Sequence, residues 1–201
     1  RSPYGASKCA ARHIVKVYRE SYDMYAVHGT LFNHEGTKRG EEFVTRKITK
    51  GVARIKKELS GGIDIEAPTP IELGNIHSKR DWSDSEDFVE GVWLMVNQEE
   101  PKDYLLASGE THTIKEFVEL AFKAANIDGH WEGEGLEERY IYKGSTHGHN
   151  LVVINEKFYR PAEVELLLGD PTDAKEKLGW NPKISFEKLV QRMVKFDLNS
   201  K

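Results

Sequence analysis

Segments with helical and strand patterns alternate along this chain of 201 residues, and this order limits its fold more than any other feature. Apolar residues at helical spacing predict helices at 5–25, 41–59 and 85–96, and later ones starting near Thr113, Asp170 and Ser185. Short β-branched and aromatic runs predict strands at 25–32, 71–75 and 103–108. Alternation of this kind is typical of an α/β fold.

Local signals set several of the element boundaries. Thr113 and Glu116 have the spacing of a capping box, and Gly179 is placed to stop the short helix that follows Pro171. We expect Gly61 and Gly62 to end the second helix. The remaining connections, at 33–40, 63–70 and 131–150, are predicted to be mostly loop.

Composition excludes several classes of partner. The formal net charge is −4 with both signs interspersed, which argues against nucleic acid, and the sequence has neither a signal peptide nor a membrane-spanning run. The single cysteine, Cys9, cannot form an internal disulfide, which favours a reducing cytoplasm. The histidines at 112, 130, 147 and 149 have no acidic or cysteine partner at ligand spacing, so we expect no metal site.

Tyr4 and Lys8 lie four residues apart on the first predicted helix, and therefore on one face. An ammonium in that position can stabilise a phenolate, which would lower the pKa of the tyrosine and make it a usable proton acceptor. The spacing alone fits equally well an exposed lysine beside a packed tyrosine. The neighbouring sequence is needed to decide between these two interpretations of the pair.

Six strings carry a resemblance to a known family. The string "SPYGASK" resembles the catalytic helix of the short-chain dehydrogenase/reductase superfamily, and "DPTDAKEKLGWNPKISFEKLV" resembles the end of its extended, sugar-nucleotide-modifying branch. Four strings between them resemble the GDP-mannose 4,6-dehydratases in particular: "LFNHEGTKRGEEFVTRKI", "ELGNIHSKRDW", "YLLASGETHTIKEFVELAF" and "YRPAEVELLLGDPT".

The resemblance implies the carboxyl-terminal part of a Rossmann-like doubly wound sheet, interleaved with a smaller α/β substrate-binding domain. Residues 1–35 would be the remnant of the NADP-binding domain, and residues 36–201 mainly the nucleotide-sugar-binding domain, with some elements returning to the first. The family's glycine-rich phosphate turn, and a threonine and a glutamate that act in elimination, have no counterpart in this sequence. We therefore expect half of an enzyme, inactive by itself.

The implied cofactor contacts are Tyr4, Lys8, His34 and Arg39. Tyr4 matches the general base and Lys8 the residue that binds the nicotinamide ribose. Arg39 matches an arginine that reaches a neighbouring subunit's cofactor, which implies a homo-oligomer, a tetramer or a dimer, with loop 34–39 near that cofactor. Lys38 stands where the family usually has a second arginine, so the charge is kept and the bidentate geometry is not.

The implied substrate contacts are those for GDP-mannose: Asn33, Lys47, Arg80, Arg160 and Glu163. Lys47, Arg80 and Arg160 match residues that bind the diphosphate, and Glu163 matches one that accepts from ribose hydroxyls. From the residues alone, Lys47 also fits a solvated helix face with Arg46, and Arg80 an exposed salt bridge with Asp81 or Asp84.

Three functions fit these observations. The first is the GDP-mannose 4,6-dehydratase reaction, which converts GDP-D-mannose to GDP-4-keto-6-deoxy-D-mannose with NADP. The second is a non-catalytic module that binds a sugar nucleotide or pairs with a full-length subunit. The third is another extended short-chain dehydrogenase/reductase, such as a sugar-nucleotide epimerase.

Overall fold

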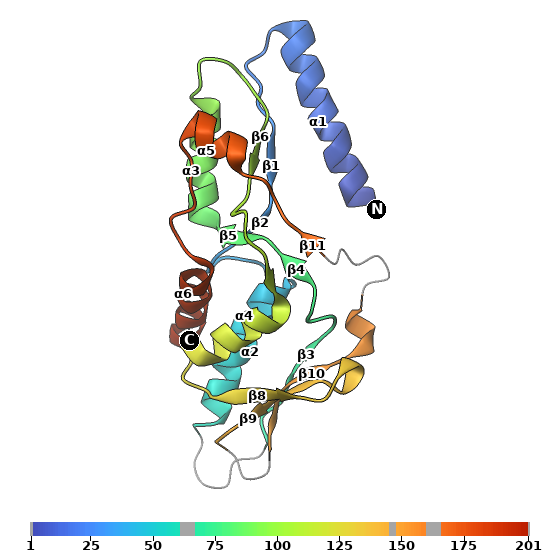
Figure 1. The fold of residues 1–201 in the computed structure, drawn as a ribbon, viewed down its shortest axis with the longest axis vertical. Helices are drawn as coiled ribbons and strands as arrows, with labels where there is room; N and C mark the ends of the chain where they lie inside the picture. The colour runs from blue at the N-terminus through green and yellow to red at the C-terminus, as the bar shows by residue number, and fades with distance from the viewer. Residues whose placement is uncertain (1, 61–66, 145–147, 160–165, 201) are drawn as a thin grey trace. The chain divides into compact units, whose positions relative to one another are not determined.

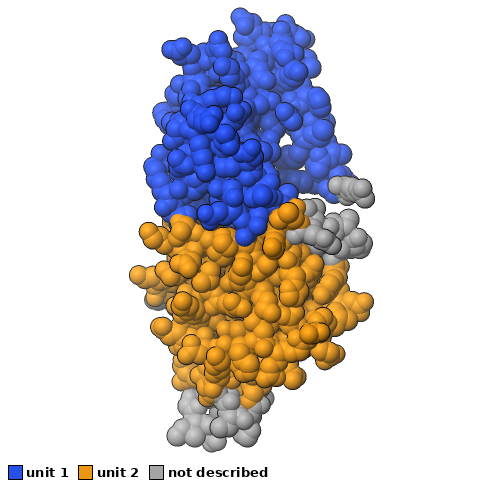
Figure 2. All heavy atoms as spheres, in the orientation of Figure 1, with its two compact units in different colours: residues 1–34, 81–111, 167–184 blue, residues 35–80, 112–166, 185–201 orange. Residues whose placement is uncertain are grey.

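The computed structural model describes residues 2–60, 67–144, 148–159 and 166–200. The chain divides into two compact units, each assembled from three separate segments. Unit 1 comprises residues 1–34, 81–111 and 167–184, and unit 2 comprises residues 35–80, 112–166 and 185–201 (Figure 2). The chain therefore passes from one unit to the other five times.

Unit 1 is built on a pair of parallel strands. The strands are β1 (Gly29–Leu31) and β6 (Tyr104–Leu106), with Gly29 opposite Tyr104. Figure 1 shows the helices α3 (Ser85–Val96) and α5 (Thr172–Leu178) on one side of this pair and α1 (Pro3–Tyr22) on the other. Strand β5 (Trp82–Asp84) leads into α3, and β2 (Asn33–Glu35) and β11 (Leu166–Leu167) lie where the chain changes unit.

The core of unit 1 gathers around two aromatic side chains. Phe88 and Trp180 meet edge to face at 5.7 Å between ring centroids, and the indole Nε1 of Trp180 donates to the carbonyl oxygen of Asp87 at 2.8 Å. Met95, Tyr104 and Leu106 complete this core with Ala174 and Leu178. The indole therefore buries its ring without leaving its only donor unpaired.

Unit 2 packs three helices beside a four-stranded sheet (Figure 1). The helices are α2 (Val44–Glu58), α4 (Ile114–Ala124) and α6 (Phe186–Asn199), and fully buried side chains such as Ile48, Phe117 and Met193 fill the space between them. The sheet has the order β3-β10-β9-β8, formed by Ile71–Leu73, Asn150–Ile154, Arg139–Tyr142 and Gly129–Glu132. Strand β10 is parallel to β3 and antiparallel to β9. Two strands, β4 (Lys79–Arg80) and β7 (His112–Thr113), form a short antiparallel ladder, and η1 (Gly135–Glu137) and η2 (Glu156–Phe158) are single 3₁₀ turns.

The predicted α/β class is confirmed, and most boundaries lie within a few residues of those expected. Thr113 and Glu116 form the capping box, Gly179 ends α5 in a left-handed conformation with φ of 65°, and Ser185 caps α6. The expectation for Gly61 and Gly62 lies outside the described residues. No helix in the described part of the chain is long and apolar enough to cross a membrane.

The prediction that 131–150 is mostly loop missed a pair of strands within it. The end of β8 and all of β9 lie in this range and belong to an antiparallel ladder in which Trp131 lies opposite Tyr140, and β10 begins at Asn150. The glycines and acidic residues that suggested a loop belong to the short connection between β8 and β9, where Gly133 and Gly135 have positive φ. Likewise, part of the predicted loop 33–40 is strand β2, and the predicted strand 25–32 is confined to Gly29–Leu31.

Gly91 on α3 provides a test of the core of unit 1. A Cβ atom at this position would lie 2.5 Å from Leu106 Cδ1 and 2.9 Å from Trp180 Nε1, two buried groups with no room to move. We expect Gly91→Ala to lower the free energy of unfolding by about 1–3 kcal/mol through overpacking, although alanine favours helices. Thermal unfolding followed by tryptophan fluorescence measures this change. Gly5→Ala is the matched control, since its Cβ would lie 3.4 Å from Ser2 Oγ; equal destabilisation by both variants would contradict the prediction.

Candidate active site

Tyr4 and Lys8 lie together on the first turns of α1. Ser2 caps this helix by accepting from the amide of Gly5 at 3.0 Å, and Pro3 occupies the first helical position. Lys8 Nζ lies 5.6 Å from the centroid of the Tyr4 ring. Tyr4 is 71% exposed, so the structure does not show the packed tyrosine that the sequence also allowed.

An ion-paired cluster ties α1 to the start of β6. Arg19 Nη1 donates to Asp103 Oδ1 at 2.8 Å and to the carbonyl oxygen of Ala26 at 3.0 Å, and Arg12 Nε lies 3.6 Å from the other Asp103 oxygen. Burial works to raise the pKa of Asp103, but Arg19, with smaller contributions from His28 and Arg12, lowers it overall.

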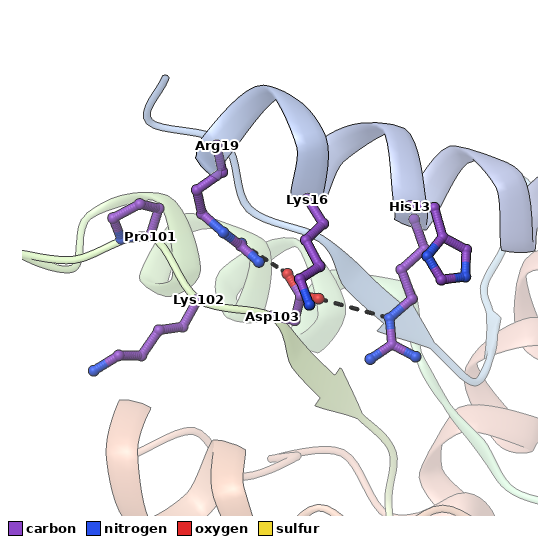
Figure 3. A pocket seen from close by; sticks show the side chains of 7 residues that line it. His13, Lys16, Arg19, Pro101, Lys102 and Asp103 are labelled. Carbon is purple, nitrogen blue, oxygen red and sulfur yellow. Dashed lines mark hydrogen bonds and ion pairs between the residues drawn. The ribbon is translucent and has the colours of Figure 1, made fainter. Parts of the chain in front are cut away.

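A cavity of about 510 Å³ opens beside this cluster. Figure 3 shows His13, Lys16 and Arg19 extending from α1 near the segment of Pro101, Lys102 and Asp103. The lining contains no residue predicted for the active site. Since α1 buries none of its own side chains, this cluster acts as its tether within unit 1.

Asn33 and His34 are consecutive residues of β2, both partly buried. The His34 ring stacks on Phe88 at 5.0 Å, and its Nδ1 lies 2.8 Å from the carbonyl oxygen of Phe32. A donating Nδ1–H fits this contact and leaves Nε2 as the acceptor. The core of unit 1 therefore fixes the orientation of the imidazole.

Arg39 follows β2 and lies over an aromatic ring. Its guanidinium carbon is 3.5 Å from the centroid of Phe43, and its Nε is 3.2 Å from Glu35 Oε2. Glu35 is 2% exposed and also accepts from the Thr45 hydroxyl at 2.6 Å. Burial raises the pKa of Glu35, and the Thr45 hydrogen bond and the Arg39 charge only partly offset the increase.

Lys47 does not continue a solvated run of charges on α2. Its Nζ lies 3.7 Å from the centroid of the Phe158 ring, and burial lowers its pKa. Its neighbour Arg46 is buried too, in an ion pair of 2.9 Å with Asp197. The fully solvated helix face that the sequence allowed is therefore wrong for these two residues.

Arg80 lies on β4, opposite His112 of β7, and its Nη1 donates to the carbonyl oxygen of Lys79 at 2.8 Å. The next residue, Asp81, is fully buried in unit 1. Its carboxylate accepts from the amides of Ser108, Gly109 and Gly169 at 2.8, 3.0 and 3.3 Å, and from the Ser108 hydroxyl at 2.6 Å. The exposed Asp81 ion pair that the sequence allowed is thus replaced by a buried loop anchor.

The predicted site residues are distributed over both units. Tyr4, Lys8, Asn33 and His34 belong to unit 1, whereas Arg39, Lys47 and Arg80 belong to unit 2. Arg160 and Glu163 lie outside the described residues. Tyr4 pairs with Lys8 on one helix, while Arg39, Lys47 and Arg80 contact Phe43, Phe158 and Lys79, respectively.

Two buried carboxylates near these residues were not anticipated from the sequence. Glu35 holds Arg39, and Asp81 anchors the chain directly after Arg80. In each case an acidic residue stands close in sequence to a candidate arginine, a pattern that fits ordinary surface charge equally well. Among the described residues, no three histidine, cysteine, aspartate or glutamate side chains gather to form a metal site.

Comparison with known proteins gives the family. A sequence model described as GDP-mannose 4,6 dehydratase matches residues 1–193. The chain belongs to the GDP-mannose 4,6-dehydratase family. It is 50% identical over 199 residues to the GDP-mannose 4,6 dehydratase of Dictyostelium discoideum, 47% over 199 residues to that of Drosophila melanogaster and 44% over 200 residues to that of Homo sapiens. Each comparison covers 98% of this chain and 53%, 48% and 50% of the relative, so the chain spans about half the length of these family members.

Two solved structures illustrate the fold of this family member. The structure of RMD from Pseudomonas aeruginosa complexed with NADPH superposes with a TM-score of 0.77 at 19% identity, over 100% of this chain and 57% of that one. The UDP-glucose 4-epimerase of Thermus thermophilus in complex with NAD gives a TM-score of 0.73 at 21% identity, over 100% and 55%. At these identities the likeness establishes the fold alone.

Proposed function

We propose that this chain is the substrate-binding part and catalytic helix of a GDP-mannose 4,6-dehydratase. The reaction converts GDP-D-mannose to GDP-4-keto-6-deoxy-D-mannose. Membership of the family across residues 1–193 carries the proposal, and the position of Lys8 beside the Tyr4 ring on one face of α1 supports it.

The chain's own residues suit the first chemical step. The chemistry that bound NADP would supply is reversible hydride transfer, with the hexose C4 as the donor and C6 as the acceptor once water is lost across C5 and C6. Tyr4 removes the proton of the 4-hydroxyl as the hydride leaves, and Lys8 holds the nicotinamide ribose and favours the phenolate. His34 and Arg39 are further proposed cofactor contacts. The phosphate-binding turn and the elimination residues that this reaction also needs have no counterpart among these 201 residues.

The nucleotide sugar is proposed to bind through Asn33, Lys47, Arg80, Arg160 and Glu163. Burial lowers the pKa of Lys47, and a partly desolvated ammonium of this kind gains from a diphosphate that restores a negative partner. We further propose a cytoplasmic homo-oligomer, in which the loop of Arg39 contacts a neighbouring subunit's cofactor. The exposed free thiol of Cys9 suits a reducing compartment.

The decisive test joins this chain to the amino-terminal half of the Dictyostelium discoideum relative in one polypeptide, called the fused enzyme below. We expect the fused enzyme to bind NADP and to form the 4-keto product from GDP-mannose. The Dictyostelium half assayed alone controls for activity of the added segment. Binding of both ligands without product would instead favour the non-catalytic module.

Arg160→Ala tests the proposed diphosphate contact in the fused enzyme. Loss of a charge-assisted contact should raise KM for GDP-mannose by about one to two decades, or about 1.5–3 kcal/mol. Steady-state kinetics measures this change. Arg54→Ala is the control, because Arg54 pairs with Glu58 on the surface of α2. A KM for GDP-mannose within about twofold of the parent value would show that Arg160 makes no important contact with the diphosphate.

A further inference from the structure

We infer that Glu35 and Phe43 are positioning residues, which hold the guanidinium of Arg39 in one orientation so that its two terminal nitrogens can bind a phosphoryl group. The inference rests on the proposed function. It adds two residues that have no part in the reaction assigned so far. All the residues involved lie in unit 2.

The guanidinium is held on two sides. Its face lies 3.5 Å from the centroid of Phe43, and its Nε, which is buried and makes no hydrogen bond within the described residues, forms an ion pair of 3.2 Å with Glu35 Oε2. A planar cation over an aromatic ring with its edge beside a carboxylate keeps little rotational freedom. Within the described part of the chain, the two terminal nitrogens of Arg39 make no hydrogen bond, and the side chain remains 22% exposed. That unused end has the spacing to receive two oxygens of one phosphoryl group.

The two holding groups are fixed in different ways. Glu35 is the last residue of β2, is 2% exposed and accepts from the Thr45 hydroxyl at 2.6 Å. Phe43 is the N-cap of α2, and its carbonyl accepts from the amide of Lys47 at 2.9 Å. The first turn of α2 therefore fixes the backbone of Phe43, while its ring is 40% exposed and lies against the Arg39 guanidinium.

The intervening loop is equally defined. The amide of Arg39 donates to the carbonyl of Gly36 at 3.1 Å, and the amide of Phe43 donates to that of Gly40 at 3.2 Å. Arg39 and Phe43 are four residues apart in the sequence. The two consecutive turns bring the Arg39 guanidinium over the Phe43 ring. The Arg39 charge and the Thr45 hydrogen bond offset part of the cost of burying the Glu35 carboxylate, which favours the contact between Glu35 and Arg39 in the folded chain.

The experiment titrates the fused enzyme with two ligands separately: NADPH, followed by its fluorescence, and GDP, followed by calorimetry. We expect Glu35→Gln and Phe43→Leu each to raise the Kd of one of the two by about three- to tenfold, since each frees one constrained side chain. Arg39→Ala should raise the same Kd by about tenfold or more. The ligand affected identifies which phosphoryl group Arg39 meets.

Glu41→Gln is the matched control. It removes the same charge from the same loop, but Glu41 is exposed and pairs with Lys50 instead. Unchanged Kd values in Glu35→Gln and Phe43→Leu, with an effect of Arg39→Ala, would overturn the positioning role while leaving the proposed function intact. Unchanged values in Arg39→Ala would overturn the phosphoryl contact itself.

A second measurement does not depend on the fused enzyme and is made on dilute samples, below the concentration at which the isolated chain associates. In the 201-residue chain labelled with ¹⁵N-arginine, the Nε–H of Arg39 should show a ring-current shift and slow exchange, because Nε is buried beside Phe43. Phe43→Leu should remove the shift, and Glu35→Gln should speed the exchange. Added inorganic pyrophosphate should move this resonance in the parent chain. A resonance at the position of free arginine in the parent would overturn the inference.

Discussion

Replacing Tyr4 by phenylalanine in the fused enzyme should lower kcat by about 100-fold or more and leave the affinity for GDP-mannose nearly unchanged. The phenol hydroxyl takes its proton only as the hydride leaves C4, so its loss removes an interaction of the transition state rather than of the bound substrate. A 100-fold loss corresponds to about 2.7 kcal/mol of activation free energy. Steady-state kinetics, with the dissociation constant for GDP-mannose measured separately, distinguishes the two effects.

Tyr22→Phe is the control for this experiment. Tyr22 lies on the same helix and is 67% exposed, so the substitution removes an equivalent hydroxyl far along α1 from Lys8. It should leave kcat at the parent value. A near-normal kcat in Tyr4→Phe would remove Tyr4 from the mechanism, and the family likeness of its helix would then be a matter of structure alone.

The 201-residue chain by itself should neither bind NADP nor dehydrate GDP-mannose. It contains no glycine-rich turn after a strand to receive the pyrophosphate, and Tyr4 and Lys8 can contact only the nicotinamide end. Calorimetric titration with NADP and an assay for the 4-keto product test both statements. The amino-terminal half, supplied in the same chain or as a separate polypeptide, should restore binding and activity together.

The exposed surface of unit 1 leads to a related expectation. Ile14, Val17 and Tyr18 on α1 are about half exposed, and Val89 and Trp93 on α3 are 70% and 66% exposed. Apolar surface of this kind favours association, so the isolated chain should aggregate as its concentration rises. A soluble chain that bound NADP stoichiometrically at micromolar concentration and formed product would refute the half-enzyme interpretation.

The sequence predicted the helices well because their signals are local. Ser85–Val96, the capping box at Thr113 and Glu116, and the stop at Gly179 each depend on residues within one or two turns. The sheet of unit 2 was missed in part because β8, β9 and β10 owe their existence to pairing with each other. The glycines and charged residues of this segment are typical of a loop. The cross-strand contact between Trp131 and Tyr140, with ring centroids 5.0 Å apart, cannot be recognised from the sequence.

The residues of the candidate site could be predicted from the sequence, but the side chains that contact them could not. Family likeness pointed to Arg39, Lys47 and Arg80, but the groups that hold them depend on burial. Glu35 and Asp81 look like ordinary surface acids in the sequence, since nothing local shows that the chain will enclose them. Phe158 meets Lys47 from a segment more than a hundred residues away, which no spacing rule could anticipate.

The repeated passage of the chain between its units constrains how the protein is made on the ribosome. The core of unit 1 needs Trp180, and that of unit 2 needs Leu189 and Met193, although unit 1 also includes residues 1–34 and unit 2 residues 35–80. Neither hydrophobic core is complete until the segment that contains Trp180, Leu189 and Met193 has left the exit tunnel. During synthesis the apolar faces of the earlier helices therefore stay exposed to solvent. Chaperones can bind the nascent polypeptide during this period.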